Sequence, residues 1–218
     1  MSKQNVAIIL NIIVVVLTIL GSIMCFGEIY FAQTKVVAHG IVNLKFFTVQ
    51  SNILGGLTAL LYVIYAIISK RTGKAIPKVV HILRFVACID LVITFLVVAL
   101  FLGFITDEGY LSMYVNANLL FHLLIPVLTF VSFVFLEEKN VLTIKHTFWG
   151  VLHLVLYSIF YLVVVLTHFN GGTIDLKYDW YAFAQRGLLI AFVCAFVVLS
   201  LGYFVSWLLY KLNKQKKD

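Results

Sequence analysis

The chain has 218 residues, of which 63% are hydrophobic and only 11% are charged. Soluble domains are about half apolar and a quarter charged, so this apolar excess cannot be buried in one globular core. The composition excludes an ordinary soluble protein. The net charge of +7 is explained by membrane orientation and contact with anionic lipid, and it does not indicate nucleic-acid binding.

Apolar runs of about 20 residues cross the hydrocarbon layer as α-helices. We predict such helices at residues 6–26, 48–68, 79–104, 115–136, 147–167 and 187–210. No linker or internal repeat divides the chain. The sequence therefore predicts one all-α domain over residues 1–218, a polytopic membrane protein built as a six-transmembrane-helix bundle.

The first apolar run follows the short basic start MSK, as a signal peptide would. Its apolar stretch is longer than a signal core, and no small-x-small cleavage site follows it. In GSIMCF, Met24 precedes Cys25 where a lipoprotein signal needs a small residue. We therefore interpret this run as the first transmembrane helix.

The basic residues orient the predicted bundle, because cytoplasmic segments are enriched in Lys and Arg. With both termini cytoplasmic, the inner segments hold Lys3, Lys70, Arg71, Lys74, Lys78, Lys139, Lys145, Lys211, Lys214, Lys216 and Lys217. The outer loops hold Lys35, Lys45, Lys177 and Arg186. This asymmetry predicts that both termini are cytoplasmic.

The stretch KFFTVQSNILGG places polar side chains at the mouth of the second predicted helix. Thr48, Ser51, Asn52, Gly55 and Ala59 share one helical face. A small, polar face should look into the bundle, where a neighbouring helix can approach closely. Two readings stay open here, namely polar contacts that hold helices together and a functional site.

The third helix carries the costliest polar residue of the chain, Asp90, in the middle of its span. Asp90 must be protonated, be paired with another helix, or face a wet cavity. Arg84 is six residues away, about 120° around the helix, and cannot easily pair with it. Arg84 and His81 share a face near the cytoplasmic end, where we expect Arg84 to reach the lipid headgroups.

The fourth helix reads NANLLFHLLIPVL and contains Asn118, His122 and Pro126. Pro126 removes the hydrogen bond to the carbonyl of His122 and is expected to kink the helix there. Both this helix and the second run from outside to inside. Thr48 and His122 are therefore expected to meet in the outer leaflet.

Aromatic residues are frequent in the fifth predicted helix and in the last outer loop. The fifth helix has a stripe of Trp149, His153, Tyr157 and Tyr161, which is either a packing ridge or part of a site. The last outer loop contains Tyr178, Trp180, Tyr181 and Phe183, either an interfacial aromatic belt or a lid over a substrate entrance. Neither the three cysteines nor the six histidines have metal-site spacing. We expect no metal and no cofactor.

The K-F-F-T at residues 45–48 with the QSN after it, the H-xxx-P of His122 and Pro126, the Trp149/Tyr157 pattern and KYDWYAF resemble the androgen-inducible membrane threonine hydrolase family. The likeness is to its bacterial six-helix branch. It implies hydrolysis of fatty acid esters of hydroxy fatty acids, with Thr48 as nucleophile and His122 as the second required residue. It also implies location in a bacterial plasma membrane. The QSN is absent from the animal enzymes, which leaves the substrate open.

The chemistry of these residues is compatible with that role. Neutral His is suited to take the proton of a threonine hydroxyl near pH 7. Asn52 is placed either to donate to an oxyanion or to orient His122. We therefore predict a lipid or acyl-ester hydrolase in the membrane with catalytic residues Thr48 and His122.

The expected substrate-binding residues are Ser51, Asn52, Asn118, Asp90, His153 and Tyr157. The partners expected are the lipid or acyl-ester substrate and the membrane, and the sequence does not indicate an oligomeric state. The alternatives are a small-molecule or proton-coupled transporter that uses Asp90 and His122, and a non-catalytic lipid-binding protein.

Overall fold

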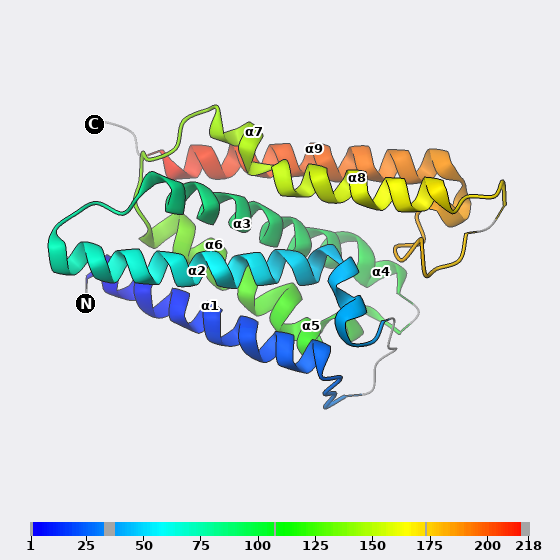
Figure 1. Cartoon of the computed structure of the whole chain (residues 1–218), viewed down its shortest axis with the longest axis horizontal. Helices are drawn as coiled ribbons and strands as arrows, with labels where there is room; N and C mark the ends of the chain where they lie inside the picture. The colour runs from blue at the N-terminus through cyan, green and yellow to red at the C-terminus, as the bar shows by residue number, and fades with distance from the viewer. Residues whose placement is uncertain (1, 33–37, 107, 173, 215–218) are drawn as a thin grey trace.

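The structure is a computed structural model that describes residues 2–32, 38–106, 108–172 and 174–214. All regular secondary structure in these ranges is helical, and the long helices lie side by side along one axis (Figure 1). Lys35, Lys216 and Lys217 of the charge pattern lie outside the described residues. The predicted all-α class is confirmed.

The predicted helices correspond to single or composite helical rods. The α-helices are α1 Lys3–Phe26, α2 Phe47–Thr72, α3 Lys78–Val97, α4 Gly103–Ile105, α5 Ala117–Leu119, α6 Ile125–Val131, α7 His146–Gly150, α8 Leu152–Thr167 and α9 Leu188–Asn213. Three π-helical segments continue these rods: η2 Val98–Leu102, η4 Leu120–Leu124 and η5 Ser132–Leu136. Short 3-10 helices are η1 Gly40–Lys45, η3 Tyr110–Tyr114 and η6 Ala184–Arg186.

Five of these rods are long and apolar enough to cross a membrane, with α8 a shorter apolar helix of 16 residues. The predicted continuous helix over 147–167 is wrong, because the chain leaves the helical conformation at Val151. Gly150 precedes the break and packs tightly, since a Cβ there would lie 2.5 Å from Ile89 and 2.7 Å from Ser206. The break places Trp149 on the surface, 60% exposed, so it does not continue the predicted aromatic stripe.

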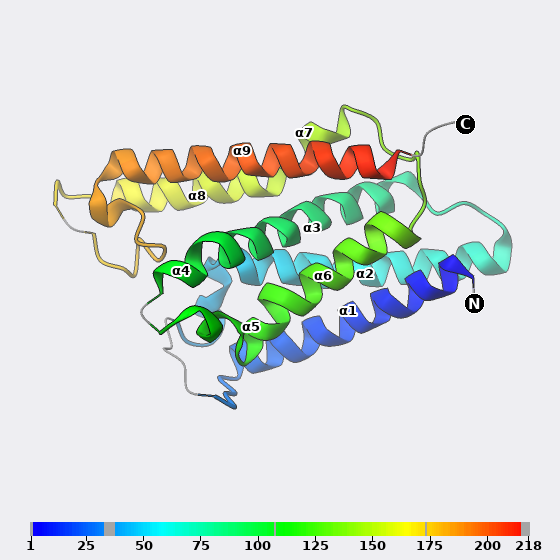
Figure 2. The same cartoon turned by 180° about the vertical axis from the view of Figure 1, so that it is seen from behind.

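The N-terminal end of α1 and the C-terminal end of α9 lie at the same end of the bundle (Figures 1 and 2). The opposite end, which we call the distal end, contains α4, α5, the end of α8 and the loop before α9. An even number of crossings would bring the termini together in this way.

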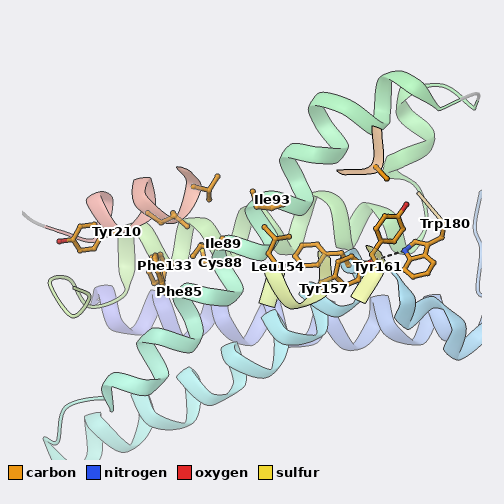
Figure 3. Close-up of a cluster of buried hydrophobic side chains, with 14 of the residues drawn as sticks. Phe85, Cys88, Ile89, Ile93, Phe133, Leu154, Tyr157, Tyr161, Trp180 and Tyr210 are labelled. Atoms are coloured by element: carbon orange, nitrogen blue, oxygen red, sulfur yellow. Dashed lines mark hydrogen bonds between the residues drawn. The ribbon is translucent and has the colours of Figure 1, made fainter. Parts of the chain in front are cut away.

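The small face of α2 packs into the bundle as predicted. Ser51, Asn52, Gly55 and Ala59 are all buried. A Cβ on Gly55 would lie 2.7 Å from Leu91 of α3, so glycine permits this close helix contact. An apolar cluster joins α2, α3, η5, α8 and α9 and continues into the distal loop (Figure 3).

A buried ion pair joins α3 to the end of the fourth rod, which consists of α5, η4, α6 and η5. Arg84 is fully buried, and its Nη2 and Nε donate to Glu137 Oε1 at 2.8 and 3.2 Å. Ser132 donates to the same oxygen at 2.9 Å, and Asn11 of α1 donates to Ser132 Oγ at 2.8 Å. The expectation that Arg84 reaches the headgroups is wrong, because packing brings a carboxylate from 53 residues away to its guanidinium.

Removing one member of this pair leaves a charge buried without its partner. Arg84→Met is expected to lower the free energy of unfolding by about 3–5 kcal/mol. The double variant Arg84→Met/Glu137→Leu should recover part of that loss, because it buries no orphaned charge. Thermal unfolding in detergent measures both, with Lys78→Met, which removes an exposed cation from the same helix, as the control. Equal destabilisation by Arg84→Met and Lys78→Met would contradict the prediction.

Candidate functional site

A cavity of about 80 Å³ lies at the distal end, enclosed by α2, α3, η2, α8, α9 and the loop before α9. Three residues with aliphatic hydroxyls line it, Thr48, Thr94 and Ser158. The remaining lining is apolar or aromatic: Phe47, Ile93, Val97, Val98, Leu102, Leu154, Tyr157, Tyr161, Tyr181, Phe183, Ala195 and Val198. The cavity is thus apolar with a few hydroxyl groups, a typical composition for a ligand site.

Thr48 lies in the first turn of α2 and lines the cavity. It is half-buried, and within the described residues its hydroxyl has no hydrogen-bond partner. The first N–H groups of a helix have no intrahelical acceptor and carry partial positive charge. A polar atom of a ligand beside Thr48 would therefore find both a hydroxyl and a favourable helix end.

Ser51 and Asn52 hold α2 to its neighbours and do not line the cavity. Ser51 Oγ is 3.0 Å from the carbonyl oxygen of Thr48 and 3.0 Å from Thr94 Oγ1. Asn52 Nδ2 donates to the carbonyl oxygens of Thr48 at 2.7 Å and Phe121 at 3.0 Å. For these two residues the contacts match the reading in which polar groups join helices.

His122 lies in the π-helical turn η4, directly before Pro126. Its Nδ1 is 2.7 Å from the carbonyl oxygen of Met113, so that nitrogen carries the proton. Ile125 N–H donates to the carbonyl oxygen of Leu120, five residues back. This π-helical bond accommodates the change in hydrogen bonding near Pro126. His122 is buried but does not line the cavity, and neither does the half-buried Asn118 of α5.

The structure therefore separates the predicted catalytic residues into two environments. Thr48 faces the cavity, while His122 faces the carbonyl of Met113. Among the described residues no hydrogen bond joins their side chains. The link between them is Asn52, whose amide bonds the Thr48 carbonyl and the residue before His122. The lining of the cavity includes Thr48 but not Ser51, Asn52 or His122.

Asp90 is paired across helices, one of the three possibilities for a carboxylate at mid-span. Its Oδ2 lies 2.6 Å from Nδ1 of His153 on α8, and its Oδ1 is buried without a partner. The His153 ring stacks on Phe47 with 5.4 Å between centroids. Since Phe47 lines the cavity, the Asp90–His153 pair supports the wall of the cavity from outside.

Residues of the last loop close the distal end of the cavity. Tyr157 donates to the carbonyl of Lys45 at 2.7 Å, and Trp180 Nε1 donates to the Tyr157 hydroxyl at 3.0 Å (Figure 3). Tyr181 Oη lies 3.1 Å from the same hydroxyl and accepts from Phe47 N–H at 3.0 Å. We call these residues of 174–186 and the side chain of Tyr157 the roof.

Asp179 fixes the shape of the roof, a role that no motif in the sequence indicates. It is fully buried, accepts from the backbone N–H groups of Phe183 at 3.1 Å and Ala184 at 2.9 Å, and pairs with the Tyr161 hydroxyl. Trp180 is also buried. These residues pack on the bundle, so they favour a lid over an aromatic belt exposed to lipid headgroups.

Lys45 lies beside the roof, with its ammonium 5.5 Å from the Trp180 ring and 5.3 Å from that of Phe46. Partial burial lowers the pKa of Lys45 from its ordinary value, while Asp175 acts in the opposite direction. Lys45 does not line the cavity. No group of three or more His, Cys, Asp and Glu in the described parts of the chain has the arrangement of a metal site.

We found no family model, no curated protein and no solved structure that matches this chain. We therefore infer the function from the geometry of the site.

The Asp90–His153 pair allows a test of the cavity wall. His153→Phe retains the stacking on Phe47 but leaves Asp90 without a partner, and we expect it to lower the free energy of unfolding by about 3–5 kcal/mol. Asp90→Asn retains a hydrogen bond to the ring and should cost about 1 kcal/mol. Thermal unfolding of the two variants in one detergent measures the difference. A His153→Phe variant as stable as Asp90→Asn would show that the pair carries no charge.

Proposed function

We propose that the chain crosses the membrane six times with both termini cytoplasmic, so that the cavity lies at the extracytoplasmic end. The support is the Lys and Arg asymmetry, the five long apolar helices with the shorter α8, and the position of both termini at one end of the bundle. The break at Val151 is accommodated by α7, which extends the α8 rod toward the cytoplasmic side.

Labelling of single cysteines by an impermeant maleimide tests this topology. In a variant whose three native cysteines are replaced by alanine, a cysteine at Asn170 should react in intact cells. A cysteine at Lys214 should react only after permeabilisation. Reaction of both positions on the same side would contradict the six-helix topology.

We propose that the protein is a membrane-embedded hydrolase of lipid or acyl esters with Thr48 as its nucleophile. The observation that carries this proposal is the Thr48 hydroxyl at the N-terminus of α2, which has no partner among the described residues and belongs to a mostly apolar cavity. An ester bound there has its acyl chain among aliphatic and aromatic side chains and its carbonyl at the polar end.

The chemistry follows from that placement. Thr48 Oγ attacks the ester carbonyl, and the oxyanion forms beside the N-terminus of α2, whose partial positive charge favours it. The hydroxyl proton ends on the departing alcohol, and water then hydrolyses the acyl–Thr48 ester to the free acid.

His122 is the proposed base. Because Nδ1 donates to the carbonyl of Met113, Nε2 carries the free lone pair. The proton reaches it through water, with Asn52 holding α2 and η4 in place.

A proton-coupled transporter needs a polar path through the middle of the membrane. The buried pairs Asp90–His153 and Arg84–Glu137 would be the charged groups along such a path. Between them, however, lie the fully buried side chains of Phe85, Cys88 and Ile89, which pack with Phe133 (Figure 3). This apolar layer favours a hydrolase with a closed cavity over a transporter.

A fluorophosphonate probe tests the nucleophile directly. The wild-type protein should be labelled, and Thr48→Ala should reduce labelling by at least about a hundredfold, because the attacking oxygen is removed. Ser158→Ala is the matched control, since its hydroxyl also faces the cavity but donates to the carbonyl of Leu154. That variant should be labelled like the wild type.

Labelling of Thr48→Ala at the wild-type level would place the nucleophile elsewhere. A wild-type protein that takes no label but binds lipid in the cavity would support the non-catalytic alternative.

A further inference from the structure

The cavity is closed on the side of the distal loop. Tyr157 joins the roof to η1 through the carbonyl of Lys45, and Tyr181 joins it to the start of α2 through Phe47 N–H. The contacts of Tyr157 with Tyr181 and Trp180 hold the roof together. Asp179 and Gln185 fix the rest of the loop, since Gln185 Nε2 donates to the carbonyl of Ile174 at 2.6 Å and to Asp179 at 3.2 Å. Entry from water would have to break several of these buried hydrogen bonds.

The lateral wall is different in kind. Between α3 and α9 it consists of Val97, Val98 and Leu102 on one side and Ala195 and Val198 on the other. In the described part of the chain no hydrogen bond joins η2 to α9. The α3–α4 rod diverges from α9 toward the distal end (Figures 1 and 2). The side chains that line this wall are apolar, and within the described residues η2 and α9 can separate without breaking a hydrogen bond.

The outer surface beside this wall suits lipid. Leu100 and Phe101 of η2 are 68% and 45% exposed, and Phe196 of α9 is 71% exposed. The π-helical turn η2 forms part of the wall, and π turns are frequent at functional sites. A chain that leaves the bilayer at this point passes from one apolar environment to another, so no desolvation opposes it.

The interior of the cavity contains no charged side chain. Its lining includes no Lys, Arg, His, Asp or Glu. The hydroxyls of Tyr157 and Tyr161 are engaged in the roof, and those of Thr94 and Ser158 contact Ser51 and the Leu154 carbonyl. A carboxylate or phosphate inside would lose its hydration and find no cation in the lining, only the Thr48 hydroxyl at the start of α2, which costs several kcal/mol.

From the roof, the wall and the absence of charge in the lining, we propose that the substrate is an uncharged acyl ester of the membrane that enters sideways between η2 and α9. Its ester group stops at Thr48, the polar end of the cavity. The inference rests on the proposed hydrolase and names its substrate class. The acid product is disfavoured in the same cavity once it ionises, so hydrolysis itself promotes release.

Photo-crosslinking in proteoliposomes tests the substrate class. A diacylglycerol with a diazirine on one acyl chain should label cavity peptides of the wild type at least about tenfold more than a diazirine fatty acid at pH 8, because the ionised head must be desolvated. Equal labelling by the two probes would overturn the inference.

Two variants of α9 test the route of entry. Ala195→Trp fills the wall of the cavity and should reduce diacylglycerol labelling at least about fivefold by competition for the same volume. Val197→Trp is the matched control, since Val197 is 55% exposed on the same helix and should leave labelling unchanged. Gel filtration checks that both variants fold. Unchanged labelling of a folded Ala195→Trp protein would exclude this route.

Thr48→Ala separates this inference from the proposed hydrolase. Crosslinking that survives in Thr48→Ala, together with fluorophosphonate labelling lost there, supports both. Selective crosslinking without any hydrolysis by the wild type would leave the binding inference standing and overturn the hydrolase. Hydrolysis of a water-soluble short ester without crosslinking from the bilayer would overturn the inference and leave the hydrolase standing.

Discussion

Polar side chains inside hydrocarbon must find partners within the protein, and two residues of α3 do so across the bundle. Arg84 pairs with Glu137, and Asp90 pairs with His153. The first contact sets α3 against the end of the fourth rod, and the second sets it against α8. The apolar surfaces of membrane helices are interchangeable with lipid, so such pairs give the bundle its specific arrangement.

The cavity exists because of that arrangement. α3 contributes Thr94 and α8 contributes Leu154, each one turn or less from a member of the Asp90–His153 pair. Phe47 connects the pair to α2, since its ring stacks on His153 and also lines the cavity. A single buried contact thereby positions three of the surfaces that surround Thr48, and the roof is fastened to the same helix end by the Phe47 N–H.

In the proposed mode of binding, the lateral wall admits the ligand and the roof retains it. Buried hydrogen bonds make the roof rigid, because each broken bond exposes an unsatisfied group. Apolar contacts make the wall yielding, because lipid can replace them. A site constructed in this way is suited to ligands that are already dissolved in the bilayer, and the uncharged interior favours neutral ones.

The sequence alone determined the membrane class, the positions of the long helices and the inward face of α2, because apolar runs and helical periodicity are local properties. It also marked Thr48 and Asp90 as unusual. Only the tertiary structure decided that Arg84 meets Glu137, that Asp90 meets His153 and that His122 turns to Met113. Pairings across tens of residues depend on how helices rotate and pack against one another, and no spacing along the chain records that rotation.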